Sequence, residues 1–460
     1  MLTLDSFRAD FERWGQLDPA REVVVAYSGG ADSTALLTLL VESGVSCVAA
    51  HLHHGMRAEA DRELALAEAY ATELGVPFVS GRADVPGMAA ARKIGLEEAG
   101  RLARQEFLRQ TCARLGVSTV ATGHTQDDHI ETMLFRMARG SGMKGLTGIP
   151  WTRDHLVRPL RGFSRAETRE FCESRGLWFH DDPANADIDM ARVRVRERVV
   201  PELRLVHPGA DLALVRLSEL VAEEDEFLNG LAARLLVAAE IPLNGRLGFL
   251  TQDCEVAMKV EVLRANPAVL MRRAVRLLAE FFGANASYEQ VMAVEQLLAQ
   301  GQRGSVTTED GLLSFIVDDE RLLVELCQRE SPFRFPLTVP GETESDEFGW
   351  KFTALPSDPT DHQRERGSME IVLNAAAIKG NLYFRSQESG DKIVPLGMSG
   401  QRLLSDALGE AKLSTHARAR LPILCDLVGP IWVPGVVMAD RVKVTPTSQK
   451  GLLVRFSPLD

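Results

Sequence analysis

Residues 23–33 read VVVAYSGGADS, an apolar run that leads directly into two glycines, an acid and hydroxyls. The three valines at its start are β-branched and suit a strand that is covered on both faces. From Thr34 to Leu40 the apolar residues follow a helical period. The sequence therefore predicts a buried strand, a tight turn and a helix, an arrangement that binds phosphate in many α/β proteins.

The turn carries the residue types that a phosphate site needs. Gly29 and Gly30 allow backbone angles that are closed to other residues, and they let a ligand approach the chain closely. Backbone N–H groups at the helix start lie at the positive end of the helix dipole. The expected phosphate-binding residues are Ser28, Gly29, Gly30, Ala31, Asp32, Ser33 and Thr34. Asp32 is also the expected ligand of Mg²⁺, which prefers carboxylate oxygens.

The full Ser-Gly-Gly-Xaa-Asp-Ser pattern separates this turn from commoner nucleotide loops. The chain has no GxxxxGK[ST], and no GxGxxG follows the first strand. A glycine-rich turn without a ligand is the alternative for the two glycines alone. With its acid and hydroxyls, the turn resembles the pyrophosphate loop of the N-type ATP pyrophosphatases. That resemblance implies cleavage of ATP between the α and β phosphates to adenylate a carbonyl-type oxygen.

Further strands alternate with helical patterns over the first two hundred residues. Apolar runs at 46–51, 78–80 and 119–123 predict a parallel α/β sheet, which binds ligands at the carboxyl ends of its strands. Polar clusters stand at three such ends: SGGADS, HLHHGMR from His51, and GHTQDDHIET from Gly123.

The third cluster has its own chemistry. His124 follows a strand, and Asp127, Asp128 and Glu131 share one face of the next helix. Helix capping accounts for one acid in a first turn but requires neither three acids nor the histidine. Such a cluster is suited to attract a cationic substrate or to accept a proton from an amine.

Length and composition indicate a multidomain enzyme. The chain has 460 residues, 45% hydrophobic and 25% charged, with a net charge of −12, and about three domains are expected at this length. The expected parts are a catalytic domain (1–205), a mainly helical middle domain (206–330), a connector (331–380) and a C-terminal α+β domain (381–460). The amphipathic start does not resemble a signal peptide, and no apolar run is long enough to span a membrane, so the expected location is the cytoplasm.

The cysteines argue against one class of function, and the basic residues favour another. The six cysteines form no CxxC pair, which favours buried small hydrophobic residues over a sulfur-transfer site. Arg192, Arg194, Arg196 and Arg198 alternate along one segment, as a phosphate-binding surface would, although a solvated, internally paired surface is the alternative. Within 381–460 ten Lys/Arg stand against seven Asp/Glu. The candidate contacts to nucleic-acid phosphates there are Lys412, Arg418, Arg420, Arg441 and Lys443.

The order of the motifs carries a closer resemblance. They are SGGADS, HLHHGMR, EEAGRLAR (97–104), GHTQDDHIETMLFRMARGSGMKGLTGI (123–149), RPL (158–160) and DPANADIDMARVRVRERVVPEL (182–203). Together they resemble the bacterial tRNA(Ile)-lysidine synthases. The stretches RSQESGDKIVPLG (385–397) and WVPGVVMADRVKV (432–444) are similar to the C-terminal module of that family.

This resemblance implies a reaction in two steps that uses ATP and Mg²⁺. In the first step, O2 of the wobble cytidine of tRNA(Ile) with a CAU anticodon attacks the α-phosphorus of ATP, releasing pyrophosphate. In the second, the ε-amine of free L-lysine attacks C2 and expels AMP. The product, lysidine, pairs with A instead of G.

The resemblance also implies roles for individual residues. His54 and Gly55 would lie near the adenine, and Arg101 would neutralise charge at the α-phosphate. The lysine and reaction site would contain His124, Asp127, Asp128 and Glu131, with one carboxylate as the base. Arg194, with Arg192 and Arg196 nearby, would lie close to the lysine or the tRNA.

Several positions depart from the family pattern, and two alternatives stay open. Val193 and Ala184 replace an Asn and a Ser, while Gln126 and His129 flank the acidic pair, with solvent exposure as one interpretation of His129. A homodimer is compatible with the sequence, which does not determine the oligomeric state. The alternative functions are an adenylating ligase or amidotransferase acting on a small metabolite and a non-catalytic tRNA-binding protein.

Overall fold

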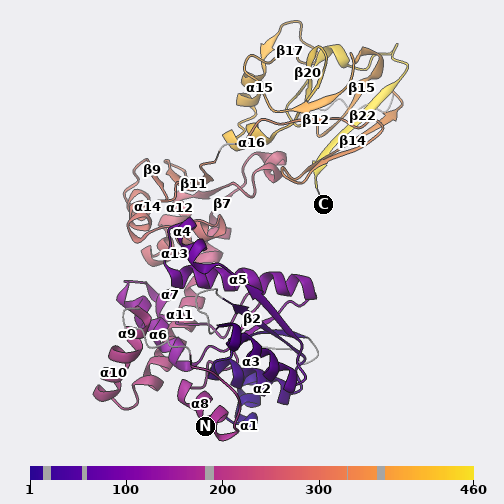
Figure 1. Ribbon diagram of the computed structural model, residues 1–460. Helices are drawn as coiled ribbons and strands as arrows, with labels where there is room; N and C mark the ends of the chain where they lie inside the picture. Colours follow the sequence, from indigo (N-terminus) through magenta and orange to yellow (C-terminus); the bar gives the residue numbers. More distant parts are fainter. Residues whose placement is uncertain (14–21, 54–59, 182–190, 329, 360–367, 460) are drawn as a thin grey trace. The chain divides into compact units, whose positions relative to one another are not determined.

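The computed structural model describes residues 1–13, 22–53, 60–181, 191–328, 330–359 and 368–459. The chain forms two compact units, residues 1–226 and residues 227–460, each with its own core (Figure 1). Among the described residues no helix is both long and apolar enough to cross a membrane. All six cysteines are free thiols, and five of them are buried, as expected, while Cys327 is exposed.

The first unit is built on a six-stranded sheet of order β3-β2-β1-β4-β6-β5. The strands are β1 (Val23–Ala26), β2 (Cys47–His53), β3 (Phe78–Arg82), β4 (Val120–Thr122), β5 (Thr152–Arg153) and β6 (Leu156–Val157). All pairs are parallel except that of β5 with β6. The strand order reverses between β1 and β4, where a parallel sheet forms its ligand crevice. The predicted α/β fold is confirmed.

Helices cover both faces of this sheet (Figure 1). They are α1 (Leu4–Arg13), α2 (Ala31–Glu42), α3 (Ala60–Glu73), α4 (Val85–Arg92), α5 (Leu96–Leu115), α6 (Gln126–Ala138), α7 (Met143–Leu146) and α8 (Arg165–Ser174). Val23 and Val25 pack with α2 on one face, whereas Val24 packs with Leu108 of α5 on the other. All three valines are fully buried, so the expectation of a strand covered on both faces is confirmed.

The arginine-rich segment forms α9 (Ala191–Arg194), a π-helical turn η2 (Val195–Val199) and α10 (Val200–Val206). The long helix α11 (Ala210–Ala239) follows. Val200 packs against Ile130 and Leu134 of α6, which fixes the segment on the helix of the acidic cluster. Single π-turns inside helices occur frequently at functional sites.

The second unit begins with a five-stranded antiparallel sheet of order β7-β8-β11-β10-β9. These strands are β7 (Glu240–Ile241), β8 (Glu255–Lys259), β9 (Gly304–Thr307), β10 (Leu313–Val317) and β11 (Arg321–Leu326). The helices beside them are α12 (Val260–Arg264), α13 (Ala268–Phe281) and α14 (Tyr288–Gln300). The segment expected to be mainly helical therefore also contains a sheet. Strands as short as β7 and β8 are too short to show a clear alternation in sequence.

The rest of the second unit contains two further sheets around an aromatic core. One has the order β12-β16-β19-β20-β21 and the other β13-β14-β22-β15. The strands are β12 (Arg334–Pro336), β13 (Gly341–Ser345), β14 (Trp350–Ser357), β15 (Glu370–Asn374), β16 (Tyr383–Arg385), β19 (Ile423–Asp426), β20 (Gly429–Val433), β21 (Val437–Met438) and β22 (Gly451–Pro458). A two-stranded sheet of β17 (Lys392–Ile393) and β18 (Arg402–Leu403) and the helices α15 (Leu404–Glu410) and α16 (Thr415–Arg420) complete it.

Residues 331–380, expected to be an irregular connector, therefore contribute four strands, β12 to β15, to these sheets. Strand β14 pairs with β22 over eight positions, from Trp350 opposite Pro458 to Ser357 opposite Gly451. The partner lies about a hundred residues later in the chain, so local composition does not reveal the pairing. Trp350 and Phe352 of β14 are fully buried against Phe384 and Phe456.

Candidate active site

The SGGADS turn lies between β1 and α2 and has little room around it. Gly29 has φ +83°, and a Cβ added there would lie 3.0 Å from Nδ1 of His180 and 3.1 Å from the ring of Trp178. The backbone N–H of His180 donates to the Gly29 carbonyl at 2.9 Å. A glycine is therefore required at this position, both by its backbone angle and by the segment that covers it.

Hydrogen bonds within the turn hold its shape. The Ser33 hydroxyl accepts from the Ser28 N–H at 3.2 Å and donates to the Gly30 carbonyl at 3.0 Å. Among the described residues no side chain caps the start of α2 after Gly30. Its first N–H groups are therefore available to an anion such as a phosphate. Thr34 is fully buried in α2, so the structure does not bring its side chain to the surface of the turn.

Asp32 lies in the first turn of α2, beside the phosphate-binding turn. Its carboxylate accepts a short hydrogen bond from the Thr168 hydroxyl and lies 3.7 Å from Nε of Arg165. Burial raises the pKa of Asp32 to about 6. Within the described part of the chain no group of three or more His, Cys, Asp or Glu side chains forms a ready metal site. Mg²⁺ needs no such group when nucleotide phosphates supply its other ligands, so a single carboxylate here fits the ion.

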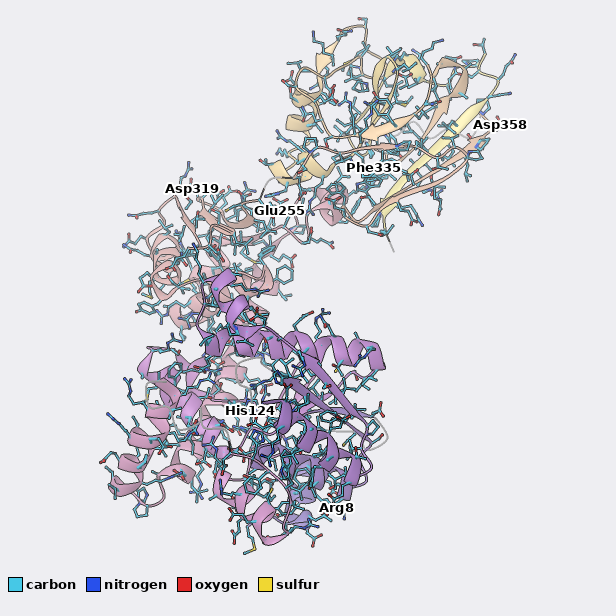
Figure 2. All side chains as sticks on the ribbon, in the orientation of Figure 1. Arg8, His124, Glu255, Asp319, Phe335 and Asp358 are labelled. Carbon is cyan, nitrogen blue, oxygen red and sulfur yellow. The ribbon has the colours of Figure 1, made fainter. Side chains whose placement is uncertain are left out.

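The second polar cluster of the site, which contains His124 and the acids of α6, follows the neighbouring strand β4. Gly123, just after β4, packs against the first turn of α2, where a Cβ would lie 3.2 Å from the Asp32 carbonyl carbon. The absence of a side chain lets the two polar clusters come together. His124 follows at once and lies within the first unit (Figure 2).

Asp128 combines a capping role with a place in the acidic cluster. Its Oδ2 accepts hydrogen bonds from the N–H and the hydroxyl of Thr125, the N-cap of α6, at 2.8 and 2.9 Å. Burial would raise the pKa of Asp128, but Arg165 and these hydrogen bonds outweigh it and hold the pKa below its usual value. Capping therefore explains Asp128 and leaves Asp127 and Glu131 to be explained otherwise.

Arg165, at the start of α8, connects the two halves of the site. Its guanidinium donates to Asp128 at 2.7 Å and to Glu131 at 3.0 Å, in addition to its contact with Asp32. Its backbone N–H donates to Asp127 at 2.7 Å. Arg165 thus contacts all four carboxylates that the sequence singled out. Burial lowers its pKa, but Asp128, Glu131 and Asp32 outweigh burial and raise the pKa above its usual value.

Two more arginines reach the cluster from the segment after it. Nε of Arg196, in η2, donates to Glu131 at 3.0 Å. The guanidinium of Arg204, in α10, lies 3.2 Å from Asp127 and 2.8 Å from Asp211. Each carboxylate of the cluster is therefore paired with an arginine. Burial raises the pKa of Glu131, and Arg165 and Arg196 oppose that rise.

His124 stands beside this ion-pair network as a neutral group. Burial lowers its pKa, and the nearby charges of Arg158, Arg104 and Arg192 lower it further. Its Nδ1 lies 2.8 Å from the Thr122 hydroxyl, which itself donates to the Val157 carbonyl at 3.4 Å. Since that hydroxyl proton is used, we assign the ring proton to Nδ1, which leaves Nε2 with a free electron pair.

His129 is not a solvent-facing helix residue, and that interpretation is corrected here. The side chain is 1% exposed. Its Nε2 lies 2.7 Å from the Ser218 hydroxyl of α11, and its Nδ1 accepts from the N–H of Ile149 at 3.0 Å. Burial, with a contribution from nearby Arg161, lowers the pKa of His129 to about 3. The residue fixes α6 to its neighbours and takes no part in the acidic cluster.

Some expected site residues lie apart from this centre. Arg101 pairs with Glu98 on the surface of α5 and is 47% exposed. Arg104, one turn further along the same helix, is among the charges that lower the pKa of His124, whereas Arg101 is not. Arg194 is exposed, while Arg196 contacts Glu131. His54 and Gly55 lie outside the described residues.

Arg165, Thr168 and Arg204 are the site residues that the sequence motifs missed. One local signal was present for the first two. Ser164 and Glu167 form a capping box, and the pattern Ser-x-x-Glu predicts a helix that starts at Arg165. That signal places Arg165 in the first turn of a helix, but it does not show that the side chain contacts the carboxylates of α2 and α6.

The basic residues of the C-terminal part differ in their surroundings. Arg420 is buried and pairs with Asp253 and Glu330, so the hypothesis that it contacts tRNA phosphates does not fit its position. Arg441 makes two hydrogen bonds to the buried Asp426 at 2.7 and 2.8 Å. Lys412 is exposed at the surface.

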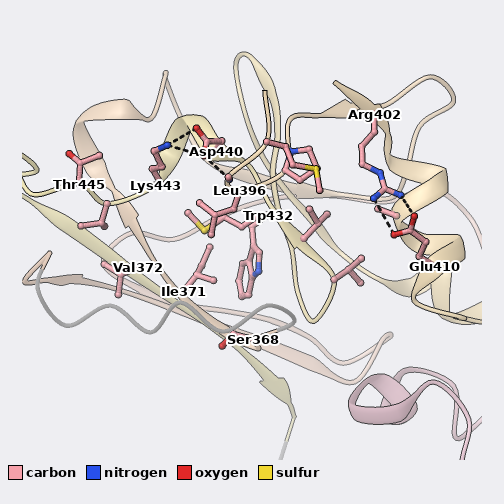
Figure 3. Close-up of a pocket in the computed structure, with 18 of the residues that line it drawn as sticks. Ser368, Ile371, Val372, Leu396, Arg402, Glu410, Trp432, Asp440, Lys443 and Thr445 are labelled. Carbon is pink, nitrogen blue, oxygen red and sulfur yellow. Dashed lines mark hydrogen bonds and ion pairs between the residues drawn. The ribbon is translucent and has the colours of Figure 1, made fainter. Parts of the chain in front are cut away.

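A pocket of about 660 Å³ lies in the same part of the chain (Figure 3). Trp432, Ile371 and Leu396 contribute to its wall, and the Lys443–Asp440 and Arg402–Glu410 ion pairs lie among its lining residues. It belongs to the second unit and contributes no residue to the site around Arg165.

Comparisons with known proteins agree with this arrangement. Residues 4–203 match the PP-loop domain family, and residues 382–454 match the TilS substrate C-terminal domain family. The tRNA(Ile)-lysidine synthase of Symbiobacterium thermophilum is 32% identical over 468 residues, covering 96% of this chain and 95% of that protein. The enzyme of the same name from Geobacter sulfurreducens is 30% identical over 464 residues, covering 98% and 97%. The chain belongs to the tRNA(Ile)-lysidine synthase family.

Proposed function

We propose that this protein joins free L-lysine, through its ε-amine, to C2 of the wobble cytidine of tRNA(Ile) with a CAU anticodon, using ATP in the cytoplasm. The observation that carries the proposal is the place of Arg165. It contacts Asp32 beside the phosphate-binding turn and Asp128 in the acidic cluster. A nucleotide and an amine bound at these two positions would therefore be neighbours, as a transfer in two steps through one intermediate requires.

In the first step the phosphate-binding turn holds ATP. The N–H groups at the start of α2 and the Ser28 and Ser33 hydroxyls would bind phosphate oxygens, and Asp32 would hold Mg²⁺. Mg²⁺ held there would supply positive charge beside the phosphates. The cytidine O2 attacks, and pyrophosphate leaves.

In the second step the amine needs a proton acceptor. The carboxylates of Asp127, Asp128 and Glu131 are already paired with arginines, which weakens each as a base. His124 is neutral and presents a free Nε2, so we assign the role to it. The ε-amine attacks C2, His124 takes the proton, and AMP leaves from the adenylated base.

The substrate tRNA is supported by the relatives of this chain. Full-length relatives carry the name tRNA(Ile)-lysidine synthase, and the match to the TilS substrate C-terminal domain lies within the second unit. We assign tRNA binding in part to that unit and expect exposed basic residues such as Lys412 to contact phosphates.

The test is the incorporation of radiolabelled lysine into a tRNA(Ile) transcript in the presence of ATP and Mg²⁺. The wild-type protein should label the transcript with a CAU anticodon and leave a matched transcript with U at the wobble position unlabelled. Equal labelling of both transcripts, or none, would contradict the proposal. Release of pyrophosphate without tRNA would favour a small-metabolite ligase instead.

A further inference from the structure

The acidic cluster, expected to attract a cation, already holds its counter-ions. Arg165 pairs with Asp128 at 2.7 Å and with Glu131 at 3.0 Å. Arg196 lies 3.0 Å from Glu131, and Arg204 lies 3.2 Å from Asp127. Each of these three carboxylates thus has a guanidinium partner, although Arg165 also lies near Asp32 and Arg204 also pairs with Asp211. Guanidinium stays protonated at any working pH.

The pairing of these carboxylates with arginines affects the protonation of the substrate amine. An amine held by unpaired carboxylates is stabilised as ammonium, which has no electron pair with which to attack. An amine beside carboxylates that are paired with arginines loses its proton more easily than an amine beside unpaired carboxylates. We propose that Arg165 is a positioning residue that neutralises Asp128 and Glu131, so that lysine reacts as the free amine. The proposal rests on the lysine-transferring function proposed above.

Arg165 is suited to this role by its reach and its surroundings. Its side chain is 30% exposed, and that of Glu131 is 7% exposed, so solvent screens the pair weakly. The fork of the guanidinium reaches both carboxylates at once, which a single ammonium at its end would not do. Removal of Arg165 leaves Asp128 without an arginine partner among the contacts described and leaves Glu131 with Arg196.

The other charges around the acidic cluster and His124 come from the elements packed on them. They are Asp32 of α2, Arg104 of α5, His124, Asp127, Asp128 and Glu131 at the start of α6, Arg158 after β6, Arg192 of α9, Arg196 of η2, Arg204 of α10 and Asp211 of α11. Of the arginines in this set, none contacts both Asp128 and Glu131. Arg165 alone among the described residues makes both contacts.

The test is the pH dependence of lysine transfer by the Arg165→Gln variant. At pH 7.5 its kcat for lysine should fall about tenfold or more, which corresponds to a rise of about one unit in the pKa of the amine. The KM for lysine should not rise, because the site has become more negative. The pH profile of kcat should move by about one unit to the alkaline side, and the defect should shrink only as the pH approaches the pKa of the bound amine. With 4-thialysine, whose amine is less basic, the defect at pH 7.5 should be smaller.

Matched variants separate this role from a structural one. Arg175→Gln alters the C-cap residue of the same helix, which pairs with Glu42 on the surface, and the pH profile of this variant should match the wild type. Arg165→Lys restores one charge and should give an intermediate shift. If Arg165→Gln does not fold, Arg196→Gln, which removes one of the two partners of Glu131, should show a smaller alkaline shift.

The outcomes distinguish the two proposals. A wild-type protein that forms no lysidine overturns the proposed function and this role with it. A wild-type protein that forms lysidine, with an Arg165→Gln defect equal at every pH and for both amines, overturns the role of Arg165 alone.

Discussion

Thr168 of α8 donates a hydrogen bond to the carboxylate of Asp32 in α2, a residue 136 positions earlier in the chain. The contact holds the start of α8 against the phosphate-binding turn, and in doing so it places Arg165 between that turn and the acidic cluster. The phosphate-binding turn and the acidic cluster are thus connected by α8, a helix that lies outside the quoted sequence motifs.

Asp32→Asn should abolish turnover while it stabilises the protein at alkaline pH. Burial raises the pKa of Asp32 from 3.8 to about 6, so the folded chain holds this proton more tightly than the unfolded chain. The stability that results is complete below pH 4 and is lost as the pH rises through about 6. At pH 8 the variant should gain roughly 1 to 3 kcal/mol in the free energy of unfolding.

Urea unfolding without nucleotide or Mg²⁺, at pH 8 and at pH 4.5, measures this difference. The gain should be smaller at the lower pH. An equal or lower stability of the variant at pH 8 would show that burial of the charged Asp32 carboxylate does not destabilise the folded protein.

His129→Gln should remove a part of the acid sensitivity of the first unit. Burial lowers the pKa of His129 to about 3, so the folded chain keeps it neutral while the unfolded chain takes up a proton below about pH 6.5. Stability is present above that pH and falls below it by up to about 1.4 kcal/mol per pH unit. Chemical unfolding between pH 7 and pH 4.5 should show a shallower decline for the variant. Parallel declines would contradict the buried, neutral state of His129.

Gly29→Ala should lose ATP affinity as well as the stability that its unfavourable backbone angle costs. A Cβ at Gly29 meets His180 and Trp178, and φ is +83°. Gly44 is a matched control, because its φ is +81° and nothing lies within 4 Å of an added Cβ. Gly44→Ala should cost about 1 kcal/mol of stability. Gly29→Ala should in addition weaken ATP binding about tenfold or more, as measured by calorimetry. Equal ATP affinities of the two variants would argue against a close fit around the turn.

Arg420→Ala should reduce the stability of the second unit, whereas Lys412→Gln should affect tRNA binding alone. Arg420 is buried with Asp253, Glu330 and the Leu250 carbonyl as partners, so its loss should destabilise the unit by about 3 kcal/mol or more. Lys412 is exposed, and its neutralisation should leave stability unchanged. It should reduce the salt dependence of tRNA affinity, with a change in slope of about one. An unchanged slope would remove Lys412 from the tRNA surface.

Local patterns predicted the first unit well because its strands are buried and its motifs are continuous in sequence. The run VVVA became β1, and the helix of the QDDHIET segment begins at Gln126. The contacts of Arg165 were not predictable, since they depend on how α8 packs against α2 and α6. In the second unit β14 pairs with β22 at long range, and no local period announces such a partner.

The central claim is that one site carries out adenylation and then amine transfer. It is tested most directly by incubating the protein with ATP labelled at the α-phosphate and tRNA(Ile) with a CAU anticodon, without lysine. We expect label on the tRNA, and its release as AMP when lysine is added. An unlabelled tRNA, or a label that lysine does not release, would contradict the account.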